Sequence, residues 1–368
     1  MNTLLPQLDT PIVSGSAFTQ ARYKIRPEFF KYLGQIVVKH YQQIEKKTWK
    51  GHRLIGIDGS TLNLPPTKEI IEQFGIMAQT EMGVKRCLAR VSLFYDLLNE
   101  FAVESEISPM DEGEKTHLFN GIKRITEQND IYILDRGYGH YNTVLKLIQS
   151  KKQFCIRFSN CSKLISNFIE GDEDDMIVDW IPSKREKENA RKQGLTPGPI
   201  KVRLTKIRLK TGEDEVLVSS LLDMQKYSYS DLKWLYQKRW IVEEGFKKLK
   251  PKMKVEYFGA RKTIGIYQEY YAHIFLMNVI SFLSIISNKK VTRKYKNRKY
   301  QYKVNWQNTY RLVRNNLLNI LSKLFHETHL VILIEKIVFS VIPIIPDKTF
   351  TRDMRHAGNK GRIHHYYK

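Results

Sequence analysis

Short apolar and alternating runs fill the first half of the chain and predict a sheet. The runs Leu54–Asp58 and Ile131–Asp135 are apolar, each ends in an acid, and both are typical of buried strands. The β-rich runs Cys87–Tyr95 and Phe101–Ile107 flank residues 96–100, which predicts a hairpin.

Helical and extended patterns then alternate. Gly113–Gln128 and Leu145–Ile148 have helical character, and Gln153–Phe158 is a further strand. This order of elements predicts a mixed α/β sheet.

The pattern changes after residue 158. The alternating runs Ile200–Leu209 and Glu215–Leu222 flank a turn at Thr211–Asp214, so a β-rich insertion is expected. A strong helix is predicted from about Ser230 to Lys250, stopped by Pro251.

The rest of the chain is predicted to be mostly helical and basic. An apolar helix over 264–287 precedes the basic tract Lys289–Lys303, a second apolar helix pair and a basic tail, Arg352–Lys368. The most apolar stretches, 274–286 and 331–346, are short, and we expect buried helices there rather than membrane spans.

The N-terminal segment Ser14–Tyr32 predicts two short helices joined near Arg26-Pro27, with Ser16 as a cap. Basic residues line one side. A helix-turn-helix fragment for DNA and a packing helix pair are both consistent with this pattern.

Charge narrows the class of partner. The chain has 61 Lys+Arg against 38 Asp+Glu, a net charge of +23 spread along its length, which favours a nucleic acid over an anionic membrane or a merely basic surface. Cys87, Cys155 and Cys161 form no metal-ligand spacing, and residues 1–20 lack a signal-peptide layout. We expect a cytoplasmic protein of bacterial type, associated with the nucleoid.

Two acids, Asp58 and Asp135, are expected at strand carboxyl ends, where ligand sites collect in open α/β sheets. Converging carboxylates are costly unless a cation neutralises them, and hard divalent ions do so with oxygen ligands. The alternative is that both residues merely cap turns, which Gly59 and Gly137 would permit.

The predicted helix 230–250 strengthens the first interpretation. Tyr236, Arg239, Glu243 and Lys250 fall within a stripe about 60° wide, at roughly 100° per residue. The alternative is a solvated charged face. On the neighbouring stripe, apolar side chains are expected to pack onto the sheet: Leu235, Val242, Phe246 and Leu249.

These residues resemble a known family. The run from Tyr236 to Lys250 resembles the Y-(2)-R-(3)-E-(6)-K signature of DDE transposases of the insertion-sequence-four family. Residues 56–61, Gly-Ile-Asp-Gly-Ser-Thr, resemble the first-aspartate motif of that family, and 134–138, Leu-Asp-Arg-Gly-Tyr, resemble its second. The resemblance covers roughly residues 14–290.

The resemblance implies an α/β fold, an RNase H-like mixed sheet with a β-rich insertion and a mostly helical C-terminal part. It implies Asp58, Asp135 and Glu243 as catalytic ligands of two divalent ions, Mg²⁺ or Mn²⁺, and Tyr236, Arg239 and Lys250 as DNA-binding residues. The implied partners are transposon terminal inverted repeats and target DNA, bound by a homo-oligomer, a dimer on paired ends. A flipped base could stack on Trp180, although core packing is the simpler role for this residue.

We therefore expect a cut-and-paste transposase, with no membrane partner. Two alternative functions are compatible with the same acids: a metal-dependent nuclease without strand transfer, and a non-catalytic DNA-binding descendant of a transposase. The expected division is a helical DNA-binding segment 1–50, catalytic core 51–158 and 229–288, β-rich insertion 159–228 and basic helical region 289–368.

Overall fold

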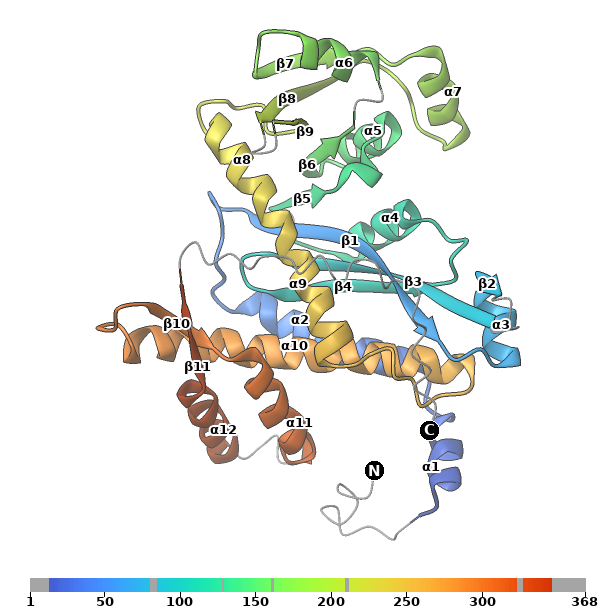
Figure 1. Ribbon diagram of the computed structural model, residues 1–368, viewed down its shortest axis with the longest axis vertical. Coiled ribbons are helices and arrows are strands. Elements are labelled where there is room, and N and C mark those ends of the chain that lie inside the picture. Colours follow the sequence, from blue (N-terminus) through green and yellow to red (C-terminus); the bar gives the residue numbers. More distant parts are fainter. Residues whose placement is uncertain are drawn as a thin grey trace.

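The computed structural model describes residues 13–79, 85–127, 129–159, 162–208, 212–322 and 327–345. A mixed sheet of nine strands forms its centre, in the order β2-β3-β1-β5-β6-β9-β8-β7, with β4 also paired to β3 (Figure 1). The strands of this sheet are β1 (Arg53–Leu64), β2 (Ala78–Gln79), β3 (Lys85–Asp96), β4 (Phe101–Ser108), β5 (Asp130–Leu134), β6 (Gln153–Phe158), β7 (Asp175–Trp180), β8 (Ile200–Arg208) and β9 (Asp214–Ser219).

Five of these strands form the RNase H-like core that the resemblance implies. Strands β4, β3 and β1 are antiparallel neighbours, and β1, β5 and β6 continue the sheet in parallel. The β3–β4 hairpin and strand β6 lie where the sequence predicts them. The predicted α/β class and mixed sheet are thus confirmed.

Strand β1 is longer than its apolar run indicates. It continues past Asp58 to Leu64 and stays paired with β3 over that length. Its second half alternates polar residues with buried Leu62 and Leu64, the pattern of a strand with one face in the core. The expectation that Asp58 ends a strand is therefore wrong.

The insertion extends the central sheet. Strand β9 pairs antiparallel with β6, and β8 and β7 follow it outward. Two helices that the sequence did not predict accompany these strands, α6 (Lys163–Glu170) and α7 (Lys184–Lys192). Trp180 is buried, with its ring edge-on to Tyr141 and Phe158, which confirms the core-packing role. Cys161 and Thr211 lie outside the described residues.

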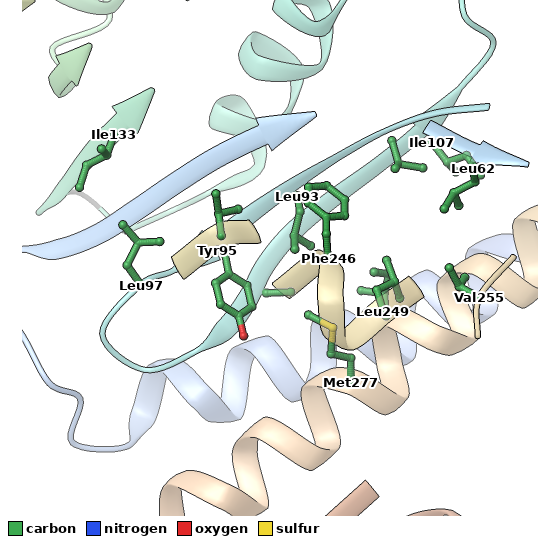
Figure 2. Close-up of a cluster of buried hydrophobic side chains, with 14 of the residues drawn as sticks. Leu62, Leu93, Tyr95, Leu97, Ile107, Ile133, Phe246, Leu249, Val255 and Met277 are labelled. Atoms are coloured by element: carbon green, nitrogen blue, oxygen red, sulfur yellow. The ribbon is translucent and has the colours of Figure 1, made fainter. Parts of the chain in front are cut away.

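Helices cover both faces of the sheet and bury a separate apolar cluster on each. One cluster includes Leu62, Leu93, Phe246, Leu249 and Met277, which point toward one another in Figure 2. The remaining helices of these layers are α3 (Lys68–Phe74), α4 (Glu114–Arg124), α5 (Tyr141–Gln149), α8 (Tyr229–Gln237), α9 (Ile241–Lys247) and α10 (Thr263–Lys294).

The helix predicted over 230–250 is segmented. A 3₁₀ turn at Lys238–Trp240 separates α8 from α9, and a π turn at Lys248–Lys252 follows α9. Pro251 lies inside that π turn, so the prediction that Pro251 stops the helix is wrong. The four predicted apolar contacts, Leu235, Val242, Phe246 and Leu249, are all buried.

The N-terminal helices are α1 (Gly15–Arg22) and α2 (Pro27–Gln43). The cap of α1 is Ser14, whose hydroxyl accepts a hydrogen bond from the Ala17 N–H, so the assignment to Ser16 is wrong. Helix α2 packs along α10 and is much longer than the predicted segment.

Helix α10 is long and apolar enough to cross a membrane by length and composition. More than half of its most apolar window is buried in the fold, as expected for a core helix. The other C-terminal elements are β10 (Gln301–Val304), α11 (Trp306–Ser322), α12 (Glu327–Phe339) and β11 (Val341–Ile344).

The stretch 331–346 differs from the buried helix expected there. Helix α12 ends at Phe339, and β11, which contains Pro343, then pairs with β10. Several apolar side chains of α12, including Val331 and Phe339, are exposed. The basic tail 352–368 lies outside the described residues.

Candidate active site

Strand register places Asp58 beside Asp135. The last parallel pair between β1 and β5 is Ile57 with Leu134, so the two acids are the next residues on adjacent strands. The last pair between β5 and β6 is Leu134 with Ile156, so Arg157 follows in the same row. The parallel pairing of these three neighbouring strands thus ends one residue before two acids and an arginine.

Arg157 holds Asp135. Its Nη2 atom lies 2.9 Å from Asp135 Oδ1, and its Nη1 donates to Glu215 of β9. This residue was missed by the sequence analysis. The available signal was an arginine inside an apolar strand, but its meaning depends on the β5–β6 register.

Helix α8 and the 3₁₀ turn supply the second half of the site. The Tyr236 hydroxyl donates to Asp135 Oδ1 at 3.2 Å. Arg239 is only 4% exposed, and its Nη2 lies 3.4 Å from Glu243 Oε1. The Nε atom of Arg239 is buried without a hydrogen-bond partner among the described residues. Three of the four signature residues therefore lie beside Asp58 and Asp135.

The two aspartates differ in their electrostatics. Burial raises the pKa of the Asp58 carboxyl to about 6, and the charges of Glu243 and Asp135 act in the same direction. Arg239 and the Gly59 N–H, which donates to Asp58 Oδ1 at 2.9 Å, offset part of this shift.

For Asp135, burial also raises the pKa. The Arg136 backbone N–H and the charges of Arg239 and Arg157 outweigh burial, so this pKa is lowered overall. Asp58 is thus the carboxyl whose negative charge is least compensated.

Lys250 lies farther along β1. Its Nζ donates to the Thr61 carbonyl at 2.5 Å, three residues beyond Asp58, and contacts none of the acids directly. Burial lowers its pKa, although Glu256 acts against that change. The structure therefore holds Lys250 at the rim of the site.

Three residues close in sequence to the site residues have different surroundings. Glu244 is exposed and pairs with Lys247 at 2.5 Å. His52 is bound to the Tyr227 hydroxyl. The sequence analysis did not select Trp240. Its side chain is 51% exposed, and the Arg239 guanidinium carbon lies 4.7 Å from the centroid of the Trp240 ring. An exposed indole of this kind can stack on a base.

The donor set fits a hard divalent cation in its chemistry. It consists of carboxylates, and the raised pKa of Asp58 marks anionic charge that a cation would relieve. Among the described residues, no three His, Cys, Asp or Glu side chains lie close enough together to hold a metal ion as they stand. The Arg239–Glu243 contact keeps the third acid partly engaged.

Comparison with known proteins gives the class. Residues 49–279, more than half of the chain, match the transposase DDE domain family. The chain therefore belongs to this family, whose members are DDE-type polynucleotidyl transferases that depend on divalent metal ions. No curated protein matches the sequence.

One solved structure with a similar fold is the piggyBac transposase in its synaptic complex with hairpin DNA. It is 12% identical, with a TM-score of 0.44. The alignment covers 82% of this chain and 61% of that one, so the chain spans less than two thirds of that transposase.

Proposed function

We propose that this protein is a cut-and-paste transposase of the insertion-sequence-four type. In this proposal it binds terminal inverted repeats, cleaves at their ends and joins them to target DNA, acting as a dimer on paired ends. The observation that carries the proposal is the row of Asp58, Asp135 and Arg157, which follow the last parallel pairs of β1, β5 and β6, with Glu243 and Arg239 beside it.

Asp58, Asp135 and Glu243 would hold the divalent ions, Mg²⁺ or Mn²⁺. When bound, such a pair of ions supplies activation of the attacking oxygen and stabilisation of the leaving oxygen in phosphodiester chemistry. Arg157 fixes the orientation of the Asp135 carboxylate, and the Gly59 N–H fixes one oxygen of Asp58. These contacts prepare oxygen donors before any ligand arrives.

The cationic residues would hold the DNA backbone. Arg239 has a buried donor without a partner among the described residues, and a guanidinium can bind a phosphate with two parallel hydrogen bonds. Lys250, at the rim, would act as a point charge for the neighbouring phosphate. The Tyr236 hydroxyl would position both Asp135 and the strand near the cut.

The test is cleavage of a plasmid that carries the native DNA flanking the gene, with and without Mg²⁺, comparing wild type with Asp135→Asn. Metal-dependent cuts at the flank boundaries, absent in the variant, and joining of the released ends to a second plasmid are expected. Cuts without joining would favour a nuclease. Binding without cuts would favour a non-catalytic descendant.

A further inference from the structure

The chain between residues 289 and 303, here called the basic tip, is the most cationic part of the described structure. It contains eight lysines and arginines and no acid. It comprises the last turns of α10, a connecting turn and the start of β10, and it projects beyond the sheet at the left of Figure 1.

Half of these cations already have partners. Lys289 pairs with Glu45 at 2.8 Å, Lys290 pairs with Glu335 at 2.7 Å, and Lys303 lies 3.5 Å from Glu100. The Lys294 ammonium lies over the Phe339 ring. These four contacts attach the tip to the rest of the protein.

The other four cations, Arg293, Lys296, Arg298 and Lys299, are exposed, and none has an acidic partner among the described residues. Like charges on neighbouring residues repel one another, and acids neutralise Lys289, Lys290 and Lys303 but not these four, which are called unpaired here because no acid among the described residues faces them. A surface that keeps such charges uncompensated is suited to a polyanion.

The tip is a folded element. The rings of Tyr295 and Tyr302 lie 5.4 Å apart, and Val291 is fully buried. The Val304 N–H donates to the Asn288 side chain, and β10 is paired with β11. The four unpaired cations are therefore presented on a fixed frame, which reduces the entropy lost on binding.

Helix α10 connects the tip to the π turn at Lys248–Lys252, which contains Lys250. Helix α10 passes under α9 at Met277, beside Phe246 and Leu249 (Figure 2). From Met277 to Lys294 the helix rises about 25 Å. A duplex lying along this part of α10 would span the same length with about seven base pairs, at about 3.4 Å per base pair.

We propose that the basic tip is a second DNA-binding surface, which contacts the backbone of the duplex outside the candidate active site. This inference rests on the proposed function for its position relative to the cut, and on the tip itself for its preference for DNA. Duplex DNA is favoured over an anionic membrane because the tip exposes no large apolar side chain among its described residues.

The first experiment compares two variants of equal charge. Lys296→Gln with Lys299→Gln removes two unpaired cations, and Lys289→Gln with Lys290→Gln removes two paired ones. Affinity for a generic 40-base-pair duplex is measured against salt concentration. We expect the slope of log K against log salt to fall by about 1.8 in the first variant, from about 0.9 per phosphate contact, and by less than half of that in the second.

The second experiment tests how far from the cut the tip contacts the duplex. Duplexes of native flanking DNA are shortened stepwise on each side of the cut, and wild type is compared with Lys296→Gln/Lys299→Gln. We expect the difference in affinity between the two proteins to disappear once one arm is too short to reach the tip. Thermal melting of each variant verifies that it is folded.

Equal slope changes in the two charge-matched variants would overturn the inference, as would a difference that persists on the shortest duplexes. Weaker binding of the first variant to phosphatidylserine vesicles, with unchanged DNA binding, would also overturn it in favour of a membrane. The generic duplex requires no cleavage, so a failed transposase assay and a failed tip assay remain distinguishable.

Discussion

The two ends of the parallel strand pair β1–β5 use charge in opposite ways. At the start, Arg53 lies directly opposite Asp130 and binds it through two hydrogen bonds of 2.8 and 2.7 Å, with side chains only 3% and 2% exposed. At the other end, two acids, Asp58 and Asp135, leave the same ladder side by side.

This difference separates stability from function. At the start of the strands, a buried arginine and aspartate satisfy each other, and Glu127 adds a further contact to Arg53. At the end, the cations are shared with other acids, and the Asp58 carboxyl forms no ion pair with the described residues. Uncompensated, partly buried charge at one end of a sheet is typical of a functional site.

The largest expected effect comes from two adjacent acids on α9. Glu243→Gln should lower plasmid cleavage by at least about a thousandfold, because it removes a candidate metal ligand. Glu244→Gln should stay within about twofold of wild type, because Glu244 is exposed and its ion pair among the described residues is with Lys247. Similar losses in both variants would show that helix charge, rather than the position of Glu243, controls the activity.

Removing the Arg53–Asp130 pair at the start of the strands should lower the stability of the fold. Arg53→Ala leaves the buried Asp130 without its partner, and we expect a loss of about 3–5 kcal/mol in the free energy of unfolding, measured by urea denaturation. Arg53→Met with Asp130→Leu should recover most of this loss, since no charge is then left buried. If the double variant is as unstable as Arg53→Ala, packing rather than charge explains the effect.

Divalent ions should stabilise the protein through Asp58 and not through the Arg53–Asp130 pair. Mg²⁺ at about 100 times its dissociation constant should add about 2.7 kcal/mol to the free energy of unfolding of wild type. Asp58→Asn should gain much less, and Arg53→Met/Asp130→Leu should gain as much as wild type. The melting temperature in the presence and absence of Mg²⁺ measures this, and an equal shift in all three proteins would place the ions elsewhere.

The smallest expected effect is on pH dependence without divalent ions. The folded state binds the Asp58 proton more tightly than the unfolded state does, because burial raises this pKa to about 6. Stability from Asp58 is therefore present below about pH 4 and is lost as pH rises to about 6. Allowing for partial exposure, Asp58→Asn should be more stable than wild type by about 1–2 kcal/mol at pH 7. Equal stability of the two proteins at pH 7 would contradict this.

The sequence alone determined the type and order of the main elements and the identity of the candidate acids. Strand β6 begins and ends at the predicted residues, and the β3–β4 hairpin lies where alternation and turn residues indicate it. The spacing of Tyr236, Arg239 and Glu243 indicated that the three side chains share one face, because a helical turn fixes which side chains do so. These features depend on neighbours within a few residues.

Tertiary structure alone decided the register across strands and the geometry of the catalytic helix. Arg157 meets Asp135 only because β6 pairs with β5 in one register, and Lys250 meets Thr61 only because a π turn carries it over β1. The insertion strands join the central sheet through β9. Contacts between residues that are far apart in the chain depend on how whole elements pack, and a local pattern of hydrophobic and polar residues does not specify that packing.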